Sequence, residues 1–176
     1  MREFRSMQQY LTLVRKIDLF RYMKDEEMNK IVAKSEIVHF KDSDKIITQG
    51  EISPFLYGII KGRVNVSAHH DNGEVFLSVL GSGEIFGESA VFLSERRTAN
   101  VTSLGNTVVL KIHRKTIISF ISDDIQAGNR ILVFLNYSLL KKLRNATQRI
   151  LKSKNVNMAM QDDDIDAHIK RFFEET

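Results

Sequence analysis

Residues 83–101 of this chain have the sequence GEIFGESAVFLSERRTANV. Glycines at positions 83 and 87 allow the backbone to turn tightly on both sides of a short apolar pair. The six residues 88–93 then have room for one short helical turn, and the N–H groups at the start of a helix point outward and favour a bound anion. The stretch therefore predicts a glycine-bounded turn that leads into an anion-binding helix start.

The arginine at position 97 is the second informative feature. We expect Arg97 to open the next strand, and its parity with Ala99 and Val101 directs its side chain towards the core. A charge in that position costs several kcal/mol unless an opposite charge lies beside it. A salt bridge to Glu88 or Glu95 would neutralise the guanidinium internally, whereas a bound anion would do so from outside.

A cyclic nucleotide matches each part of this pattern. Its singly charged phosphate suits the planar fork of an arginine together with backbone donors, and its ribose hydroxyl suits an acceptor carboxylate. Gly87, Glu88 and Arg97 fall within eleven consecutive residues. Their combination favours a bound cyclic mononucleotide over an internal salt bridge.

The stretch also resembles the phosphate-binding cassette of the cyclic-nucleotide-binding domain shared by catabolite-activator-type regulators, cyclic-nucleotide-dependent kinases and nucleotide-gated channels. The resemblance covers roughly residues 18–152 and includes IITQGE at 46–51 and LYGIIKGRVNV at 56–66. It implies that Glu88 holds the ribose 2′-hydroxyl and that Arg97 holds the cyclic phosphate. The ligand-binding residues that it implies are Gly87, Glu88, Ser89, Ala90, Arg97 and Thr98, with the backbone amides of Ser89 and Ala90 facing the phosphate.

Two positions depart from the pattern of that family. Ser89 stands where the family usually has an aliphatic residue, and Arg96 stands where it often has proline. Neither change removes a ligand group. We interpret Arg96 as a solvated charge at a loop end, although it leaves a cyclic dinucleotide open as a ligand. Thr98 often accompanies cGMP acceptance in this family, but the sequence does not separate cAMP from cGMP.

The chain on both sides of this stretch predicts an α+β fold. Residues 37–112 alternate apolar and polar positions, and turn residues interrupt them at Gly50, Gly62, 71–73, 81–83, Gly87 and 105–106, which is typical of an antiparallel, jelly-roll-like β-roll. Helical spacing marks residues 1–36, where Asp25 can cap the second helix, and residues 113–152. We therefore predict one cyclic-nucleotide-binding domain over residues 1–152 and a C-terminal tail over 153–176.

The long helix predicted from about Ile125 to Leu151 carries a coiled-coil seam. Its positions follow four- and three-residue steps: Leu132, Asn136, Leu139, Leu143, Ala146 and Ile150. The seam predicts a homodimer, and its alternative is a face packed on the β-roll. The further apolar residues Ile131, Phe134, Leu135 and Leu140 indicate that one face of the helix is buried in either case.

Two polar residues of the same helix are candidates for covering the nucleotide base. In the resembling family the base is covered by the C-terminal helix, which by chain position implies a lid formed by Asn145 and Thr147. The alternative is that both side chains face solvent. With no catalytic or DNA-binding domain expected, ligand binding would be transmitted by this helix or the tail to a protein partner that the sequence does not identify.

Several function classes are disfavoured by composition. The chain has no cysteine, and His69 and His70 are adjacent, so that on a strand they point to opposite faces and cannot easily share a metal ion. Fewer than 30 residues follow Leu151, too few for a recognition module, and the net charge of +4 indicates only loose attraction to polyanions. No apolar run has membrane-spanning length.

The sequence as a whole predicts a cytoplasmic sensor of cAMP or cGMP. We expect no enzymatic activity, no cofactor, no metal, no specific nucleic-acid partner and no membrane partner. The alternative is a dimerisation or docking module that has inherited this fold and binds no nucleotide.

Overall fold

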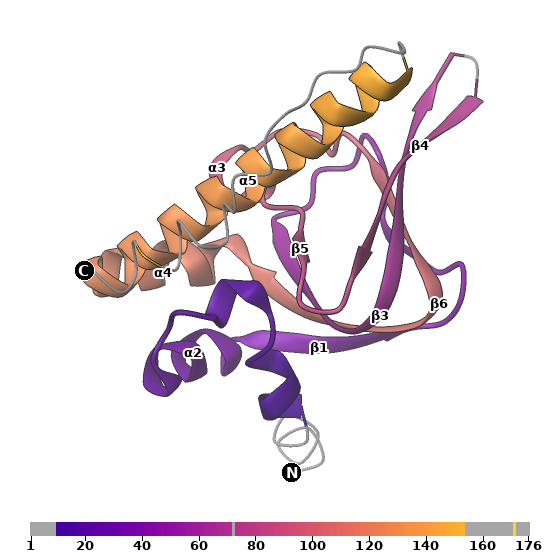
Figure 1. Cartoon of the computed structure of the whole chain (residues 1–176). Helices are drawn as coiled ribbons and strands as arrows, with labels where there is room; N and C mark the ends of the chain where they lie inside the picture. Colours follow the sequence, from indigo (N-terminus) through magenta and orange to yellow (C-terminus); the bar gives the residue numbers. More distant parts are fainter. Residues whose placement is uncertain (1–9, 72, 154–170, 172–176) are drawn as a thin grey trace. The chain divides into compact units, whose positions relative to one another are not determined.

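The computed structural model describes residues 10–71, 73–153 and 171 of the 176-residue chain. These residues divide into a first unit that ends at Gly128 and a second that begins at Asn129, inside the long helix α5 (Ile125–Ser153). Helices precede and follow a set of antiparallel strands, which confirms the predicted α+β fold (Figure 1). No helix among the described residues is long and apolar enough to cross a membrane.

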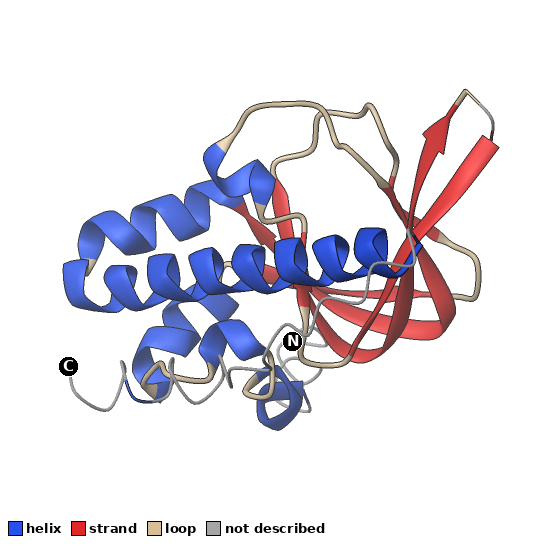
Figure 2. Ribbon diagram, turned by 45° about the horizontal axis from the view of Figure 1, so that its top comes forward, coloured by secondary structure: helices blue, strands red, loops and turns tan. Residues whose placement is uncertain are grey.

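The first unit is built on one antiparallel sheet. Among the described residues its strands are β1 (Ser35–Phe40), β2 (Lys45–Ile47), β3 (Phe55–His70), β4 (Gly73–Gly81), β5 (Ile85–Phe86) and β6 (Asn100–His113). Their order is β1-β6-β3-β4, with β2 paired to β6 and β5 paired to β3. Because β3 and β6 are long and each pairs with several strands, the sheet curves into a roll (Figure 2).

The interior of the roll is apolar, and its packing holds the backbone at Phe86, just before the candidate site. Tyr57 on β3 stacks on Phe86 of β5, with ring centroids 5.0 Å apart and planes 6° apart. Both rings belong to a cluster that also contains Ile47, Ile59, Val64, Leu80, Val101 and Val109. The burial of Phe86 anchors the backbone one residue before Gly87.

The hairpin predicted around residues 71–73 is confirmed, whereas the predictions of a turn at Gly62 and at 105–106 were wrong. His70 pairs with Gly73 across the β3–β4 hairpin. Gly62 and Gly105 lie inside β3 and β6, where they adopt φ angles of +94° and +73°. The register of β3 against β6 shifts on either side of Lys61, so positive-φ glycines here accompany an irregularity in a continuing strand.

The N-terminal helices begin slightly differently from the prediction. Helix α2 (Asp25–Val32) starts at Asp25 itself, so this residue is not the cap. Lys24 occupies the cap position, and its backbone N–H donates to the Glu27 carboxylate over 2.8 Å. The sheet also starts at Ser35 and ends at His113, one or two residues beyond the predicted 37–112, and α4 (Arg114–Asp123) follows directly.

The segment before α2 is held against the roll at two points. Ile17 lies so close to Gly58 on β3 that a Cβ atom there would be 2.8 Å from the Ile17 Cδ1. At the start of the 3-10 helix η1 (Asp18–Phe20), the Asp18 N–H donates to the Gly83 carbonyl over 2.8 Å. These two contacts therefore fix the N-terminal segment to β3 and to Gly83, where the segment 83–97 begins.

Helix α5 supplies the second unit. Ile131, Phe134 and Leu135 are buried, as predicted, but Leu140 is 54% exposed and the prediction for it was wrong. The buried positions end at Ser138, and four apolar residues beyond it are exposed: Leu139, Leu140, Leu143 and Ile150. Of the predicted tail 153–176, only Ser153 and Arg171 belong to the described residues.

Candidate functional site

Gly87 occupies a position that only glycine fits. It follows β5 with a φ of +80°, in the left-handed region that side chains rarely adopt. A Cβ atom at this position would lie 2.8 Å from the Arg97 Nη1 and 3.0 Å from the Phe55 carbonyl oxygen. The glycine therefore permits both the turn and the close approach of the arginine.

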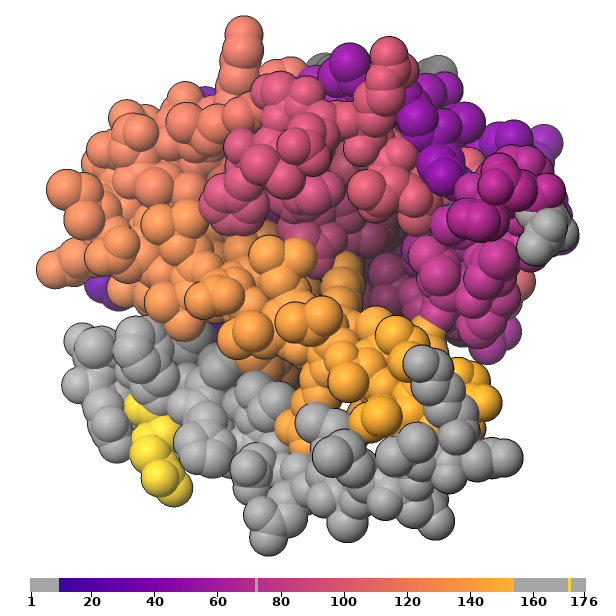
Figure 3. Space-filling model, turned by 90° about the horizontal axis from the view of Figure 1, so that it is seen from above, coloured from indigo at the N-terminus to yellow at the C-terminus, as the bar shows by residue number. Residues whose placement is uncertain are grey.

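Glu88 follows as the cap residue of the short helix α3 (Ser89–Phe92), and the segment around this helix, coloured pink, forms part of the surface seen in Figure 3. Its side chain is only 5% exposed, whereas Ser89 is exposed. The Ala90 N–H, which was expected to face a phosphate, donates to the Gly87 carbonyl over 3.2 Å. That amide is therefore engaged by the turn in this structure.

Arg97 lies ahead of strand β6 and not at its start. The strand begins at Asn100, and Arg97 occupies the extended segment before it. Its backbone pairs instead with a turn on the far side of the site, because its N–H donates to the Glu51 carbonyl and its carbonyl accepts from the Gly50 N–H, both over 2.8 Å. The predicted inward direction still holds, since the side chain is 6% exposed.

Among the described residues, the hydrogen-bond partners of the Arg97 guanidinium are uncharged oxygens. Its Nη1 donates to the Gly87 carbonyl over 3.1 Å, and its Nη2 donates to the Phe55 carbonyl over 2.5 Å and to the Ser53 Oγ over 3.4 Å. Its Nε is buried without a hydrogen-bond partner. In the part of the chain that the structure describes, no carboxylate lies within ion-pair distance of Arg97, so the internal salt bridge considered above is not formed.

The electrostatics of the site follow from this burial. Loss of solvent lowers the pKa of Arg97 below its ordinary value, while Tyr57 and Glu88 act in the opposite direction. An arginine nevertheless stays protonated in proteins. The site thus holds a desolvated positive charge, with a buried carboxylate and a phenol in its electrostatic neighbourhood.

The residues on either side of Arg97 are exposed. Thr98 is accessible to a ligand. Arg96 is exposed too, as expected, but it is not simply solvated, because its Nη1 donates to the Gly50 carbonyl over 2.8 Å. The two adjacent arginines therefore contact the same segment, residues 50–55.

The two candidates for the base lid belong to the second unit. Asn145 and Thr147 are both exposed on α5. The Thr147 hydroxyl donates to the Leu143 carbonyl over 3.0 Å, one helical turn earlier. Its proton is engaged within the helix, so Thr147 has only its oxygen lone pairs to offer.

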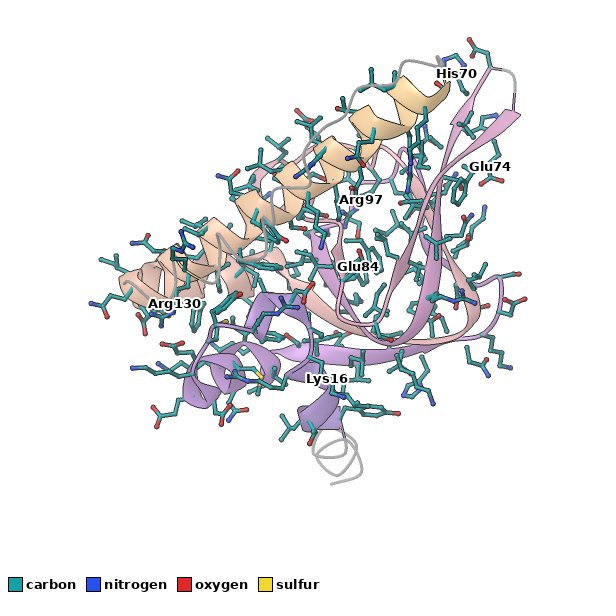
Figure 4. All side chains as sticks on the ribbon, viewed as in Figure 1. Lys16, His70, Glu74, Glu84, Arg97 and Arg130 are labelled. Atoms are coloured by element: carbon teal, nitrogen blue, oxygen red, sulfur yellow. The ribbon has the colours of Figure 1, made fainter. Side chains whose placement is uncertain are left out.

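Three residues that contact or influence Arg97 were not among the predicted site residues. They are Ser53, Phe55 and Tyr57. The stretches that resemble the family, residues 46–51 and 56–66, lie on either side of residues 52–55. Figure 4 shows Arg97 beside β5, well away from the hairpin tip marked by His70 and Glu74. Within the described residues, no cluster of three histidine or acidic side chains could hold a metal ion.

A family model matches the part of the sequence that forms this site. The model described as "Cyclic nucleotide-binding domain" matches residues 37–124, which run from within β1 to just past α4 and include the whole of the Gly87–Arg97 segment. The chain belongs to the cyclic nucleotide-binding domain family. The match ends one residue before α5, so the domain signature rests on the roll and the helix that follows it.

Individual relatives support the assignment of this cyclic nucleotide-binding domain. The chain is 33% identical over 125 residues to the cAMP-activated global transcriptional regulator CRP of Haemophilus influenzae, covering 70% of this chain and 50% of that protein. It is 30% identical over 113 residues to human cGMP-dependent protein kinase 2, covering 62% of this chain and 15% of the kinase. The chain thus spans half or less of the length of these relatives.

A solved structure of similar size has the same fold. The cyclic nucleotide-binding domain from Methylobacillus flagellatus aligns with a TM-score of 0.73 at 22% identity, covering 89% of this chain and 87% of that one. At this identity the likeness supports the fold.

Proposed function

We propose that this cyclic nucleotide-binding domain binds cAMP or cGMP at the Gly87–Arg97 segment and passes the signal to a protein partner through α5. In this proposal Arg97 holds the cyclic phosphate and Glu88 accepts a hydrogen bond from the ribose 2′-hydroxyl. Gly87 lets the backbone approach the phosphate closely. Ser89, Ala90 and Thr98 surround the ligand, and Asn145 and Thr147 are candidates for contacting its base.

The buried guanidinium of Arg97 carries this proposal. Its described partners are two carbonyl oxygens and a hydroxyl, none of which neutralises its charge, and its Nε proton has no acceptor. A phosphate can accept from Nε and a terminal nitrogen at once, in the bidentate geometry that arginine favours. One cyclic mononucleotide would therefore supply both the missing charge and the missing acceptor.

The two named relatives support both ligands equally. One is named for cAMP and the other for cGMP. The exposed hydroxyl of Thr98 lies next to Arg97 in the chain, where a purine base would extend from a phosphate held by the arginine. We accordingly propose the class of ligand and leave the choice of base to measurement.

Calorimetry with ligand-stripped protein tests the proposal. We expect cAMP, cGMP or both to bind with a stoichiometry of one per chain, and mass spectrometry of the denatured protein to identify any nucleotide that copurifies. Linear AMP and GMP are the matched control ligands, because they carry the same bases without the singly charged ring phosphate. If neither cyclic nucleotide binds at millimolar concentration, the chain is instead a docking or dimerisation module.

The exposed apolar residues of α5 support a dimer as one output of the domain. Leu139, Leu143 and Ile150 occupy the predicted seam positions and are exposed. We propose that they pair with the same residues of a second chain. Sedimentation should show a dimer at tens of micromolar that Leu139→Glu combined with Leu143→Glu converts to a monomer. A parent protein that is already monomeric at this concentration would contradict the seam.

A further inference from the structure

The arginine beside the proposed phosphate ligand has a contact that its exposure does not suggest. Arg96 donates from Nη1 to the Gly50 carbonyl over 2.8 Å, across 46 positions of the sequence. Gly50 lies in a turn closed by a hydrogen bond from the Glu51 N–H to the Thr48 carbonyl. The Gly50 φ of +86° belongs to this turn. The long side chain of Arg96 therefore reaches back to a defined structural point.

The same turn holds the backbone of Arg97. The Gly50 N–H donates to the Arg97 carbonyl, and the Arg97 N–H donates to the Glu51 carbonyl. On the far side of the turn, the Gln49 N–H donates to the Asn100 Oδ1 over 2.8 Å. Four hydrogen bonds thus attach the Gly50 turn to residues 96, 97 and 100, and the one from Arg96 is supplied by an exposed side chain.

From the turn, the chain runs directly into the acceptors of the guanidinium. Ser53 and Phe55 follow Gly50 by three and five residues, and both accept from the Arg97 Nη2. A shift of the turn against residues 96–97 would therefore move these acceptors and the guanidinium relative to each other. Since bidentate recognition of a phosphate requires a fixed guanidinium plane, such a shift would weaken binding without removing any ligand group.

We infer that Arg96 is a positioning residue, which clamps the Gly50 turn onto the backbone of Arg97 and so sets the orientation of the Arg97 guanidinium. The inference rests on the proposed nucleotide site and names a residue that acts on the ligand through its neighbour. It replaces the expectation that Arg96 is a solvated charge with no role.

Nucleotide affinity gives the first test. Arg96→Ala should raise the Kd for the bound cyclic nucleotide about 3- to 10-fold, the amount that corresponds to the net contribution of one typical hydrogen bond. Arg96→Lys should recover part of the affinity, because it keeps a donor on a long side chain. Arg63→Ala is the matched control, since Arg63 is exposed on β3 and its side chain makes no hydrogen bond or ion pair among the described residues.

Salt separates positioning from simple attraction of the phosphate. At 1 M salt the screening length is about 3 Å, so an effect of Arg96 through distant charge would disappear there. The clamp predicts that the loss of affinity in Arg96→Ala persists at 1 M salt. A loss that vanishes with salt, or one equal to that of Arg63→Ala, overturns the inference.

Hydrogen exchange of the nucleotide-free protein gives a second, ligand-independent test. In Arg96→Ala the amides of Gly50 and Arg97 should exchange several-fold faster, while amides of the β3–β6 ladder stay as protected as in the parent. Unchanged exchange at Gly50 and Arg97, or equal acceleration throughout the sheet, overturns the clamp. If the parent binds no nucleotide, the proposed function fails, yet this measurement still decides whether Arg96 holds the turn.

Discussion

Two groups of polar residues make contacts at opposite ends of strand β3, and they differ in how their hydrogen bonds are satisfied. The first is the arginine site, made of Gly87, Glu88 and Arg97. The second, which we call the hairpin network, lies towards the β3–β4 turn and consists of Gln49, Ser67, His69 and Glu74. Both groups join segments that are distant in sequence.

The members of the hairpin network form hydrogen bonds with one another. The buried Ser67 hydroxyl donates to the Glu74 carboxylate. The Gln49 side chain pairs with the backbone of His69, donating to its carbonyl over 3.2 Å and accepting from its N–H over 2.6 Å. Among the described residues, the Arg97 guanidinium instead makes no ion pair, and its Nε has no acceptor. Complete internal pairing indicates a structural role, and incomplete pairing of a buried charge indicates a ligand.

The largest expected effect follows from removing the unpaired charge. Arg97→Ala should cost about 2–5 kcal/mol of binding free energy for cAMP or cGMP, the usual loss when one partner of a buried charge-assisted pair is removed. Arg97→Lys should also bind poorly, because an ammonium keeps the charge but loses the planar two-pronged donor. Calorimetry on ligand-stripped protein measures both losses.

Arg97→Lys should have little effect on folding if the arginine site serves ligand binding and the hairpin network serves structure. A buried charge with neutral partners contributes little net stability. The urea midpoint of Arg97→Lys should therefore stay close to that of the parent, so that its loss of binding is not a loss of fold. Full nucleotide affinity in Arg97→Ala would show that the unpaired guanidinium is not the ligand site.

Glycines with positive φ in the two regions sharpen the comparison. Gly87→Ala and Gly73→Ala should each destabilise the fold by about 1–3 kcal/mol, because alanine is strained at both backbone conformations. Only at Gly87 does the new Cβ atom meet a neighbour, the Arg97 Nη1, whereas nothing lies within 4 Å of the equivalent atom at Gly73. Nucleotide binding should consequently be lost in Gly87→Ala alone, as measured by calorimetry at a temperature where both variants are folded.

Equal losses of affinity in the two alanine variants would mean that binding follows general stability. The comparison of Gly87 with Gly73 would then not support a close approach of the Gly87 backbone to the nucleotide.

Much of the fold was visible in the sequence because its causes are local. Alternating apolar residues predicted the strands, and the turn at 71–73 predicted the β3–β4 hairpin. Gly62 and Gly105 were misread as strand ends because a positive-φ glycine has the same local chemistry in a turn and in an irregular strand. Pairing with a distant strand decides between them, and periodicity does not report it.

The candidate site divides in the same way. Gly87, Glu88 and Arg97 lie within eleven residues, so the sequence alone predicted that they form one site. The acceptors from Ser53 and Phe55 are 44 and 42 residues away from Arg97. The Phe55 acceptor is a backbone carbonyl, which every residue carries, so no side-chain pattern could have marked it. The contact of Arg96 with Gly50 was missed for the same reason.

Glu88→Ala should weaken nucleotide binding less than Arg97→Ala does. It removes one acceptor for a ribose hydroxyl, an interaction that contributes about 1–2 kcal/mol. The 2′-deoxy analogue of the bound cyclic nucleotide provides the control, because it lacks the hydroxyl that Glu88 is proposed to accept from. The analogue should bind the parent and Glu88→Ala with nearly equal affinity. If Glu88→Ala weakens the deoxy analogue as much as the parent ligand, Glu88 acts on Arg97 and not on the ribose.

The smallest effect on ligand binding is expected from the hairpin network. Ser67→Ala removes the donor to Glu74, which can then turn towards solvent because Glu74 is exposed. The cost should be about 1 kcal/mol of folding stability, the typical net contribution of one hydrogen bond, and it should be visible as a lower urea midpoint. Nucleotide affinity should remain within about twofold of the parent, since a change of that size lies well below one hydrogen bond. A larger loss of affinity in Ser67→Ala would show that the two groups on β3 are energetically coupled. In that case the completeness of internal pairing would not separate a structural group from a binding one in this domain.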